Sequence, residues 1–155
     1  MQIRARADDD ASALVAILAE VHERDHYPAR PINVRREWLW QDDFVGAWVA
    51  DDGGDVVGHV ALAGAFTGPG VPDGALGISR LFVASRANGR GAGAALLAAA
   101  RAAAGDRPLG LEVADSSTAA RALYERLGWR RVGEDLAAWE TPDGRHPALT
   151  YFVAP

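Results

Sequence analysis

The stretch Asn88-Gly89-Arg90-Gly91-Ala92-Gly93 decides the fold of this 155-residue chain. It lies between an apolar run, Leu76 to Val83, and an alanine-rich run, Ala94 to Ala104, whose compositions predict a β-strand and an α-helix. A glycine-rich turn therefore opens a helix. Because glycine frees backbone N–H groups to face a concavity, and the start of a helix carries about half a unit of positive charge, the turn suits a phosphate or diphosphate. A tight turn without a ligand is the alternative at this stage.

Composition predicts one compact domain over residues 1–155, because 49% of the residues are hydrophobic and no linker divides the chain. The absence of cysteine excludes disulfides, thiolate metal sites and a cysteine nucleophile. No spacing of histidine, aspartate and glutamate resembles a metal site. No apolar run approaches the roughly 20 residues that cross a bilayer, so we expect a soluble, cytoplasmic protein without a membrane partner.

Charge argues against a nucleic-acid partner, because the net charge is −5 and no basic face is evident in the sequence. All 16 basic residues are arginine. Acidic residues gather in Asp8 to Asp10, in Glu20, Glu23 and Asp25, and in Asp42 and Asp43. Such a surface either steers a cationic substrate or simply keeps the protein in solution.

Hydrophobic periodicity and turn residues predict the remaining elements. The first is a short strand, followed by a helix capped by Asp10 and a second short helix with Asn33 as its cap. A hairpin, the central strand, the alanine-rich helix ended by Gly105, a buried strand, another helix and two closing strands follow. The expected ranges are Gln2 to Arg6, a helix burying Leu14, Ile17, Leu18 and Val21, then Arg35 to Gln41, Ala47 to Ala50, Val56 to Ala63, Leu109 to Ala114, Ser117 to Leu127, Trp129 to Trp139 and Pro147 to Val153.

The resulting order, β-α-α-β-β-β-α-β-α-β-β, predicts an α/β fold with a mixed sheet and helices on both faces. The alanine-rich helix should connect two neighbouring parallel strands. Ligands of such sheets bind at the carboxyl ends of the strands. The glycine-rich turn lies at that edge.

Two motifs then resemble the GNAT superfamily of acyl-CoA-dependent N-acyltransferases. The first runs through Ile78-Ser79-Arg80-Leu81-Phe82-Val83 and Asn88 to Leu97, and the second is Ala119-Ala120-Arg121-Ala122-Leu123-Tyr124-Glu125-Arg126-Leu127-Gly128-Trp129. The resemblance implies a single GNAT-like domain with splayed parallel strands at the coenzyme site. It also implies an N-acetyltransferase that uses acetyl-CoA and no metal, and that acetylates a primary amine of a small molecule or peptide by direct attack in a ternary complex.

The resemblance further implies where the coenzyme binds. Backbone amides of Gly89 to Ala94 would hold its diphosphate, and the pantetheine arm would lie along Leu81 to Val83 like an extra strand. The Val83 N–H would polarise the thioester carbonyl. The implied coenzyme-binding residues are Leu81, Phe82, Val83, Asn88, Gly89, Arg90, Gly91, Ala92, Gly93, Ala94, Ser117 and Tyr124.

Tyr124 is the side chain expected to carry chemistry. A phenol has a reference pKa of about 10 and a thiol of about 8.5, so a nearby tyrosine can protonate the departing coenzyme thiolate as general acid. The alternative is a helix tyrosine that packs its ring and hydrates its hydroxyl.

The chain departs from the family pattern at three positions. Asn88 stands where arginine or glutamine is usual, so Arg86 or Arg90 is expected to compensate. Ser117 stands where asparagine is frequent, and Ser116 or Ser117 alternatively only caps a helix. Gly77 occupies the position of the usual glutamate base.

The general base is therefore unassigned from the sequence. The candidates are His26, Glu23, His59 and Ser79, of which His26 is the base named here, because its loop borders the acceptor site in relatives and histidine titrates near neutrality. A surface role for His26 and a core role for His59 are the alternatives. Tyr27, Trp38 and Trp40 either line the acceptor pocket or belong to the core.

Two other functions compete with the enzyme. A non-catalytic acyl-CoA sensor of the same fold is compatible with the glycine at position 77. A nucleotide-binding domain fits less well, because the loop lacks the lysine of a P-loop. The region expected to choose the acceptor, His22 to Phe44, carries no interpretable motif, and the C-terminal strands offer a surface for a homodimer.

Overall fold

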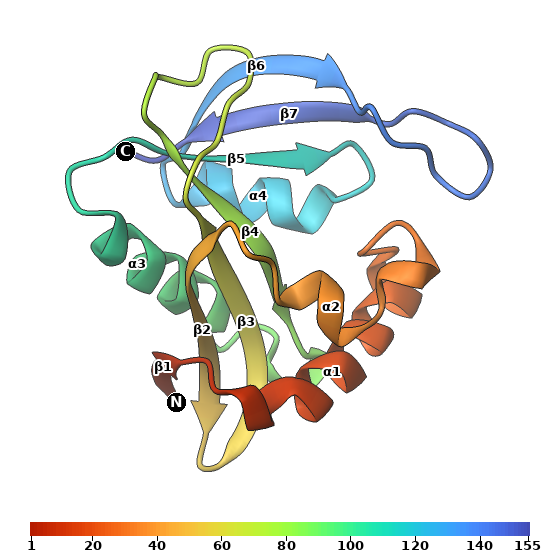
Figure 1. The fold of residues 1–155 in the computed structure, drawn as a ribbon, viewed down its shortest axis with the longest axis vertical. Helices are drawn as coiled ribbons and strands as arrows, with labels where there is room; N and C mark the ends of the chain where they lie inside the picture. Colours follow the sequence, from red (N-terminus) through yellow and green to blue (C-terminus); the bar gives the residue numbers. More distant parts are fainter.

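The computed structural model describes all residues from Met1 to Pro155. Seven strands form one mixed sheet in the order β1-β2-β3-β4-β5-β7-β6 (Figure 1). The strands are β1 (Gln2–Ala5), β2 (Phe44–Asp52), β3 (Asp55–Ala63), β4 (Leu76–Val83), β5 (Leu109–Ala114), β6 (Arg130–Leu136) and β7 (Ala148–Val153), and the helices are α1 (Ala11–Asp25), α2 (Arg36–Leu39), α3 (Ala92–Ala104) and α4 (Thr118–Arg126). The predicted order of elements and the predicted fold class are confirmed.

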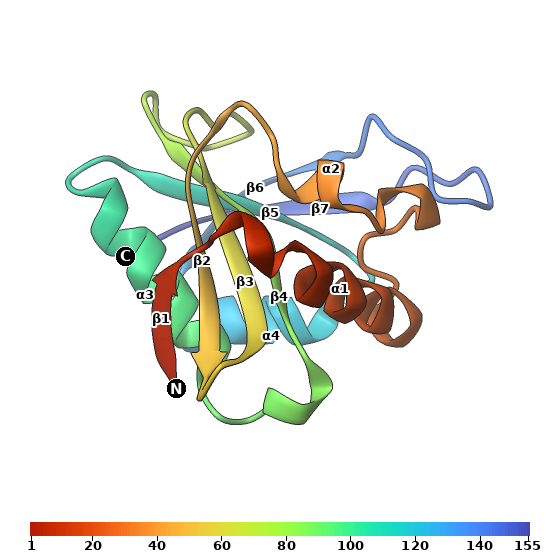
Figure 2. The same cartoon turned by 60° about the horizontal axis from the view of Figure 1, so that its bottom comes forward.

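Helices cover both faces of the sheet. In Figures 1 and 2, α1 and α2 lie on one face of β3 and β4, and α3 and α4 lie on the other. Adjacent residues of β3 face opposite sides of the sheet. A Cβ added to Gly58 would lie 3.1 Å from Leu96 of α3. The next side chain, His59, faces the other side and contacts Arg6. The predicted apolar stripe of α1 is confirmed, because Leu14, Ile17, Leu18 and Val21 are all at most 3% exposed.

The sheet opens between its two central parallel strands. β4 pairs with β5 only at Leu76↔Leu109 and Gly77↔Gly110, whereas β3 and β4 share five paired positions. Beyond these two pairs the strands diverge, so that β5, β7 and β6 run across the direction of β2 to β4 (Figure 1). We call this opening the β4–β5 gap. The backbone edges that face it are available to an extended ligand.

A phenylalanine ring closes the narrow end of the β4–β5 gap. Cβ atoms added to Gly77 and to Gly110 would each lie 2.9 Å from Phe66. The Phe66 ring also lies 6.1 Å from the Tyr151 ring, centroid to centroid. Glycine at both positions is therefore what lets the ring lie directly on the sheet.

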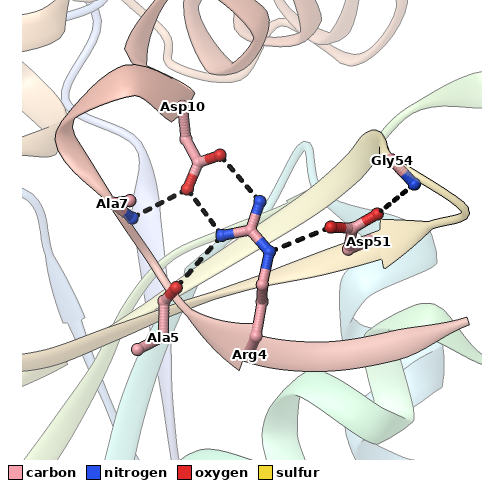
Figure 3. Close-up of polar contacts among 6 residues, drawn as sticks. All are labelled: Arg4, Ala5, Ala7, Asp10, Asp51 and Gly54. Atoms are coloured by element: carbon pink, nitrogen blue, oxygen red, sulfur yellow. Dashed lines mark hydrogen bonds and ion pairs between the residues drawn. The ribbon is translucent and has the colours of Figure 1, made fainter.

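An arginine ties the first strand to its neighbours (Figure 3). Arg4 donates two hydrogen bonds to Asp10, at 2.8 and 2.9 Å, and one to Asp51 at 2.9 Å. These contacts hold the pKa values of both carboxyls below their usual range. The Asp10 carboxylate also accepts the Ala7 N–H at 2.7 Å, so it bonds the turn before α1 and makes no hydrogen bond to the helix start. The predicted side-chain cap by Asp10 was wrong for this reason.

Several other boundaries differ from prediction: β2 is longer than Ala47 to Ala50, and α2 is shorter than Arg35 to Gln41. Three further differences have a local cause. Asn33 belongs to a 3-10 turn, Pro31–Asn33, so Arg35 precedes α2 in its place. α3 begins two residues early, at Ala92, because Gly91 adopts the left-handed conformation that ends the turn. β6 stops at Leu136 and not at Trp139, because its partner strand begins at Ala148, opposite Leu136. Gly105, with φ +62°, ends α3 as predicted.

Candidate active site

The glycine-rich turn presents unused backbone donors at the start of α3. Gly89 and Gly91 have φ values of +76° and +80°, and no atom lies within 4 Å of a Cβ added to either. The first helical hydrogen bond runs from Ala95 N–H to Gly91 O, at 3.0 Å. None of the turn or cap hydrogen bonds is donated by Gly91 to Ala94. The turn thus leaves backbone donors free at the start of a 13-residue helix, an arrangement that suits an anion.

The two arginines of this turn bind the β2–β3 hairpin. Arg86 makes a two-point contact with Asp55, both distances being 3.0 Å, and Arg90 contacts Asp52 at 2.7 Å. These pairs raise the pKa of both arginines. The structure therefore ties the turn to the hairpin through both guanidinium groups.

The last residues of β4 turn one backbone N–H toward the gap. Ala84 N–H donates to Val57 O of β3 at 2.8 Å. Because successive amides of a strand point to opposite edges, the Val83 N–H points away from β3, toward the β4–β5 gap. Arg24 of α1 contacts Val83 O at 3.3 Å, and Glu20 accepts the Ser85 N–H at 2.7 Å. Two side chains of α1 thus fix the backbone that ends β4.

Tyr124 lies in α4 at the other side of the gap. Its side chain is 5% exposed and packs against the rings of Trp129 and Phe152, at centroid distances of 5.7 and 6.0 Å. Burial, with a smaller contribution from Tyr27, raises the pKa of its hydroxyl. The phenol therefore keeps its proton at neutral pH, as a proton donor must.

Tyr27 approaches the same place from the loop after α1. Its ring packs edge-on against Trp38, with centroids 5.6 Å apart. Burial raises the pKa of Tyr27 to about 12, although the guanidinium and the backbone N–H of Arg80 act in the opposite direction. Tyr27 also contributes to the raised pKa of Tyr124.

Glu112 of β5 is a functional candidate that sequence reasoning missed. Glu112 pairs with Tyr151 of β7. Gly110, two positions earlier in β5, faces Phe66, and alternate residues of a strand share a face. Glu112 therefore lies on the α1–α2 face. Burial and, to a smaller extent, the Glu112 carboxylate raise the pKa of Tyr151 to about 12. The same carboxylate also raises the pKa of Tyr27. The missed signal was a single charged residue inside an otherwise apolar strand.

A buried histidine holds the irregular part of β4. Pairing between β3 and β4 shifts register between His59 and Ala61, and Arg80 opposite the shift has φ +55°. His59 Nδ1 lies 2.7 Å from Arg80 O, and Nε2 lies 3.1 Å from Arg6 Nη1. Because arginine only donates, Nε2 accepts and Nδ1–H donates to Arg80 O. Burial lowers the pKa of His59 to about 4.

The other candidate bases take different places. His26 is exposed at the end of α1, with φ +57°, and its side chain makes no hydrogen bond. Glu23 is exposed on the same helix. Ser79 Oγ accepts a hydrogen bond from Arg80 Nη1 at 3.1 Å. His59 has both ring nitrogens occupied by Arg6 and Arg80 and is fully buried, which is the core role weighed for it above.

The remaining predicted coenzyme residues border the gap or the turn. Leu81 is half-buried, Phe82 is buried with its ring stacked on His59 at 5.2 Å, and Asn88 is exposed. Ser117 precedes α4 without making a side-chain cap hydrogen bond. Trp38 and Trp40 are half-buried and carry arginines on their faces: Arg80 lies 3.9 Å from the Trp38 ring centroid, and Arg6 lies 3.7 Å from that of Trp40.

A groove of about 620 Å³ lies between the segment before α2 and the β6–β7 loop. One wall comes from Arg30, Pro31 and Ile32, and the other from residues 138–142. Ile32 and Trp139 are 60% and 37% exposed, so apolar surface lines it on both sides. No group of three or more histidine, cysteine, aspartate or glutamate residues lies together as a metal site would require. None of the helices has the length and apolar character needed to span a bilayer.

A mixed sheet that opens between two parallel strands, next to a glycine-rich helix start, defines the N-acyltransferase class of fold. The chain belongs to the acetyltransferase (GNAT) family, whose model matches residues 12–129. The resemblance seen in the two motifs is thereby confirmed, and with it the acyltransferase class of activity that the family implies. A search of curated protein sequences finds no match.

Solved structures share the fold over the whole chain. Ribosomal-protein-alanine N-acetyltransferase from Brucella melitensis is 27% identical, with a TM-score of 0.72 over 99% of this chain and 98% of its own. The protein smu.2055 from Streptococcus mutans is 17% identical, with a TM-score of 0.78 over 99% and 98%. The protein yncA from Salmonella typhimurium, solved with its cofactor acetyl-CoA, is 19% identical, with a TM-score of 0.73 over 99% and 92%.

Proposed function

We propose that this protein transfers an acetyl group from acetyl-CoA to a primary amine of a small molecule or peptide, by direct attack in a ternary complex. The observation that carries the proposal is the β4–β5 gap, which has the unused amides of the α3 turn at its coenzyme end and Tyr124 beside it. Membership of the GNAT family and the acetyl-CoA in the yncA structure support the choice of donor.

The coenzyme is assigned to the α3 side of the gap. Backbone amides from Gly89 to Ala94 would bind the diphosphate, because all of them except that of Arg90, which donates to Ala87 O at 3.4 Å, are free donors at the positive end of a helix. The pantetheine arm would follow the edge of β4 at Leu81, Phe82 and Val83, as an added strand does. Asn88, Arg90 and Ser117 border this path and are the proposed side-chain contacts.

The acceptor reaches the site as an ammonium ion and first gives a proton to Glu112. The resulting amine attacks the thioester carbon, and the Val83 N–H stabilises the negative charge that forms on the carbonyl oxygen. The C–N bond forms, the C–S bond breaks, and the thiolate leaves. Tyr124 donates its proton to the thiolate and regains one, through water, from the nitrogen, which sheds its second proton as the amide forms. No covalent intermediate on the protein is required, which suits a chain without cysteine.

Glu112 is the proposed base because its place satisfies two conditions. It lies on the α1–α2 face, beside Tyr27 and Tyr151, whereas the coenzyme turn opens on the α3 side. It is also exposed, so a proton accepted there can pass on to water. His26, the base named from the sequence, remains a second candidate; it is exposed at the end of α1, and its side chain makes no hydrogen bond.

The test is a thermal-shift assay with acetyl-CoA, desulfo-CoA and ATP, followed by release of free thiol with a panel of amines. Stabilisation by both coenzyme forms, with thiol release that depends on an amine, supports the proposal. Stabilisation without release for any amine identifies an acyl-CoA sensor. Stabilisation by ATP alone overturns the assignment of the coenzyme.

A further inference from the structure

Arg80 is a half-buried cation without an anionic partner. Its Nε donates to Trp38 O at 2.9 Å, its Nη1 donates to Ser79 Oγ at 3.1 Å, and its guanidinium lies over the Trp38 ring. None of the ion pairs of the chain includes it. Asp43 is the only carboxylate near enough to affect its pKa, and burial outweighs that effect. A cation in such a place favours binding of an anion.

Arg4 shows how the same chain neutralises a half-buried arginine elsewhere. It meets two carboxylates, Asp10 and Asp51, at 2.8 to 2.9 Å (Figure 3). Arg6 is also half-buried and makes no ion pair, but its Nη1 bonds both Leu39 O and His59, and its guanidinium packs on Trp40. Arg80 differs from both in lying on β4, directly before the proposed pantetheine edge, with its Nη2 free of hydrogen bonds.

Arg80 lies next to the proposed reaction centre on the α1–α2 face. It directly precedes Leu81 to Val83, the proposed pantetheine edge of β4. Its guanidinium packs on the Trp38 ring at 3.9 Å, and Tyr27 contacts the same ring edge-on at 5.6 Å. Glu112 lies on the same face of the neighbouring strand β5, and both charges affect the pKa of Tyr27. The acceptor side of the gap thus offers a positive group on β4 and a negative group on β5.

We propose that the acceptor is an amine that also carries a carboxylate close to its nitrogen, such as a free α-amino acid, and that Arg80 binds this carboxylate. The inference rests on the proposed function and names the substrate class of the same site. The acceptor's ammonium group lies beside Glu112, where it loses its proton, while its carboxylate meets the free Nη2 of Arg80. Placing the two charges in this way orients the nitrogen toward the thioester.

An extended peptide is the occupant that this arrangement disfavours. The first residue of a peptide carries an amide where a free amino acid carries its carboxylate, and an amide leaves Arg80 without an anion. The groove at Arg30 and Trp139 would in that case hold the rest of the peptide. For a free amino acid, the same groove lies open to the acceptor's side chain.

The experiment compares matched acceptor pairs. Thiol release from acetyl-CoA is measured with a set of amino acids, with their carboxamides and with dipeptides that begin with the same residue. The ratio of kcat/KM for acid over amide is determined for the wild type and for Arg80→Gln, because comparing the two proteins cancels the different basicities of the amines. Arg36→Gln is the matched control, since Arg36 also stacks on a tryptophan but lies at exposed Asp8.

We expect the ratio of acid to amide to fall about 10- to 100-fold in Arg80→Gln, the effect of losing one charged hydrogen-bonding partner, and to stay unchanged in Arg36→Gln. An unchanged ratio in Arg80→Gln, or wild-type preference for the amide or dipeptide at a pH where both amines are unprotonated, overturns the inference while leaving acetyl transfer intact. No thiol release with any amine instead refutes the proposed function. If acetyl-CoA does not stabilise Arg80→Gln, the variant has lost the coenzyme site and its ratio is not used. The wild-type preference between acid and amide, at the pH where both amines are unprotonated, then decides whether the inference holds.

Discussion

Gly77 and Gly110 form the last pair that joins β4 to β5, and the Phe66 ring lies over both. A side chain at position 77 would meet Phe66 at 2.9 Å, so the usual glutamate of this family has no room there. Glu112 lies on the same face, two residues beyond Gly110 on the neighbouring strand. We therefore propose a carboxylate on β5 in place of a base on β4.

Glu112→Gln is expected to lower kcat/KM about 100-fold near neutral pH, because the amide cannot accept the proton of the amine. The loss should shrink as the pH rises toward the pKa of the acceptor amine, which then enters without its proton. Initial rates of thiol release across that pH range check this. Glu125→Gln, on the exposed side of α4, is the control and should behave as the wild type. A loss that is constant at every pH would remove Glu112 from proton transfer.

Tyr124→Phe is expected to reduce kcat about 100-fold with little change in the dissociation constant of acetyl-CoA, because only the proton donated to the leaving thiolate is lost. The raised pKa of Tyr124 means that the phenol stays protonated below pH 10 and adds no ionisation step to the neutral range. Steady-state rates and calorimetric titration with acetyl-CoA measure the two quantities. Wild-type kcat in the variant would leave the ring with a packing role only.

Gly91→Ala is expected to weaken acetyl-CoA binding more than tenfold, because its added Cβ points into open space that the proposed diphosphate fills. Gly74→Ala is matched to it: Gly74 has φ +78°, also has nothing within 4 Å of an added Cβ, and lies outside the turn. Both variants should lose about 1 kcal/mol of stability from backbone strain. Equal acetyl-CoA affinity in the two variants would place the diphosphate elsewhere.

His59 predicts a specific loss of stability in mild acid. Its pKa is about 4 in the folded protein and its ordinary value is 6.5, so the unfolded chain binds the extra proton between these values. Stability is therefore complete above pH 6.5 and falls as the pH drops toward 4, by about 2 kcal/mol between pH 7 and pH 5. Urea unfolding of the wild type and of His59→Asn measures this slope. The variant, which keeps a donor for Arg80 O, should be less stable at pH 7 and should show a flatter dependence.

Local signals were enough to predict most of the fold. The apolar run from Leu76 to Val83 and the run from Leu109 to Ala114 became β4 and β5 with the predicted bounds, because each is a short apolar segment ended by turn residues. Gly105 ended α3 for the conformational reason given by the sequence. The parallel pair followed from the connecting helix.

The candidate site was less accessible from the sequence, because its residues meet only through tertiary structure. Tyr27 and Tyr124 lie nearly a hundred positions apart in the sequence, and nothing local indicates that Tyr27 affects the pKa of Tyr124. Glu112 and Arg80 became candidates only once the structure showed on which face of β5 and β4 they lie. Asp10 similarly satisfied the local rule for a cap and was taken instead by Arg4.

The contacts of α1 with the end of β4 couple the proposed acetyl-CoA side of the site to the proposed acceptor side. Arg24 touches Val83 O, and Glu20 holds the next turn, while the same helix leads directly into the loop of Tyr27. A tilt of this helix on arrival of the acceptor would therefore shift the Val83 amide, the proposed donor to the acetyl carbonyl. Changing this helix to accommodate another acceptor would therefore also change how strongly the Val83 amide can polarise the thioester of acetyl-CoA.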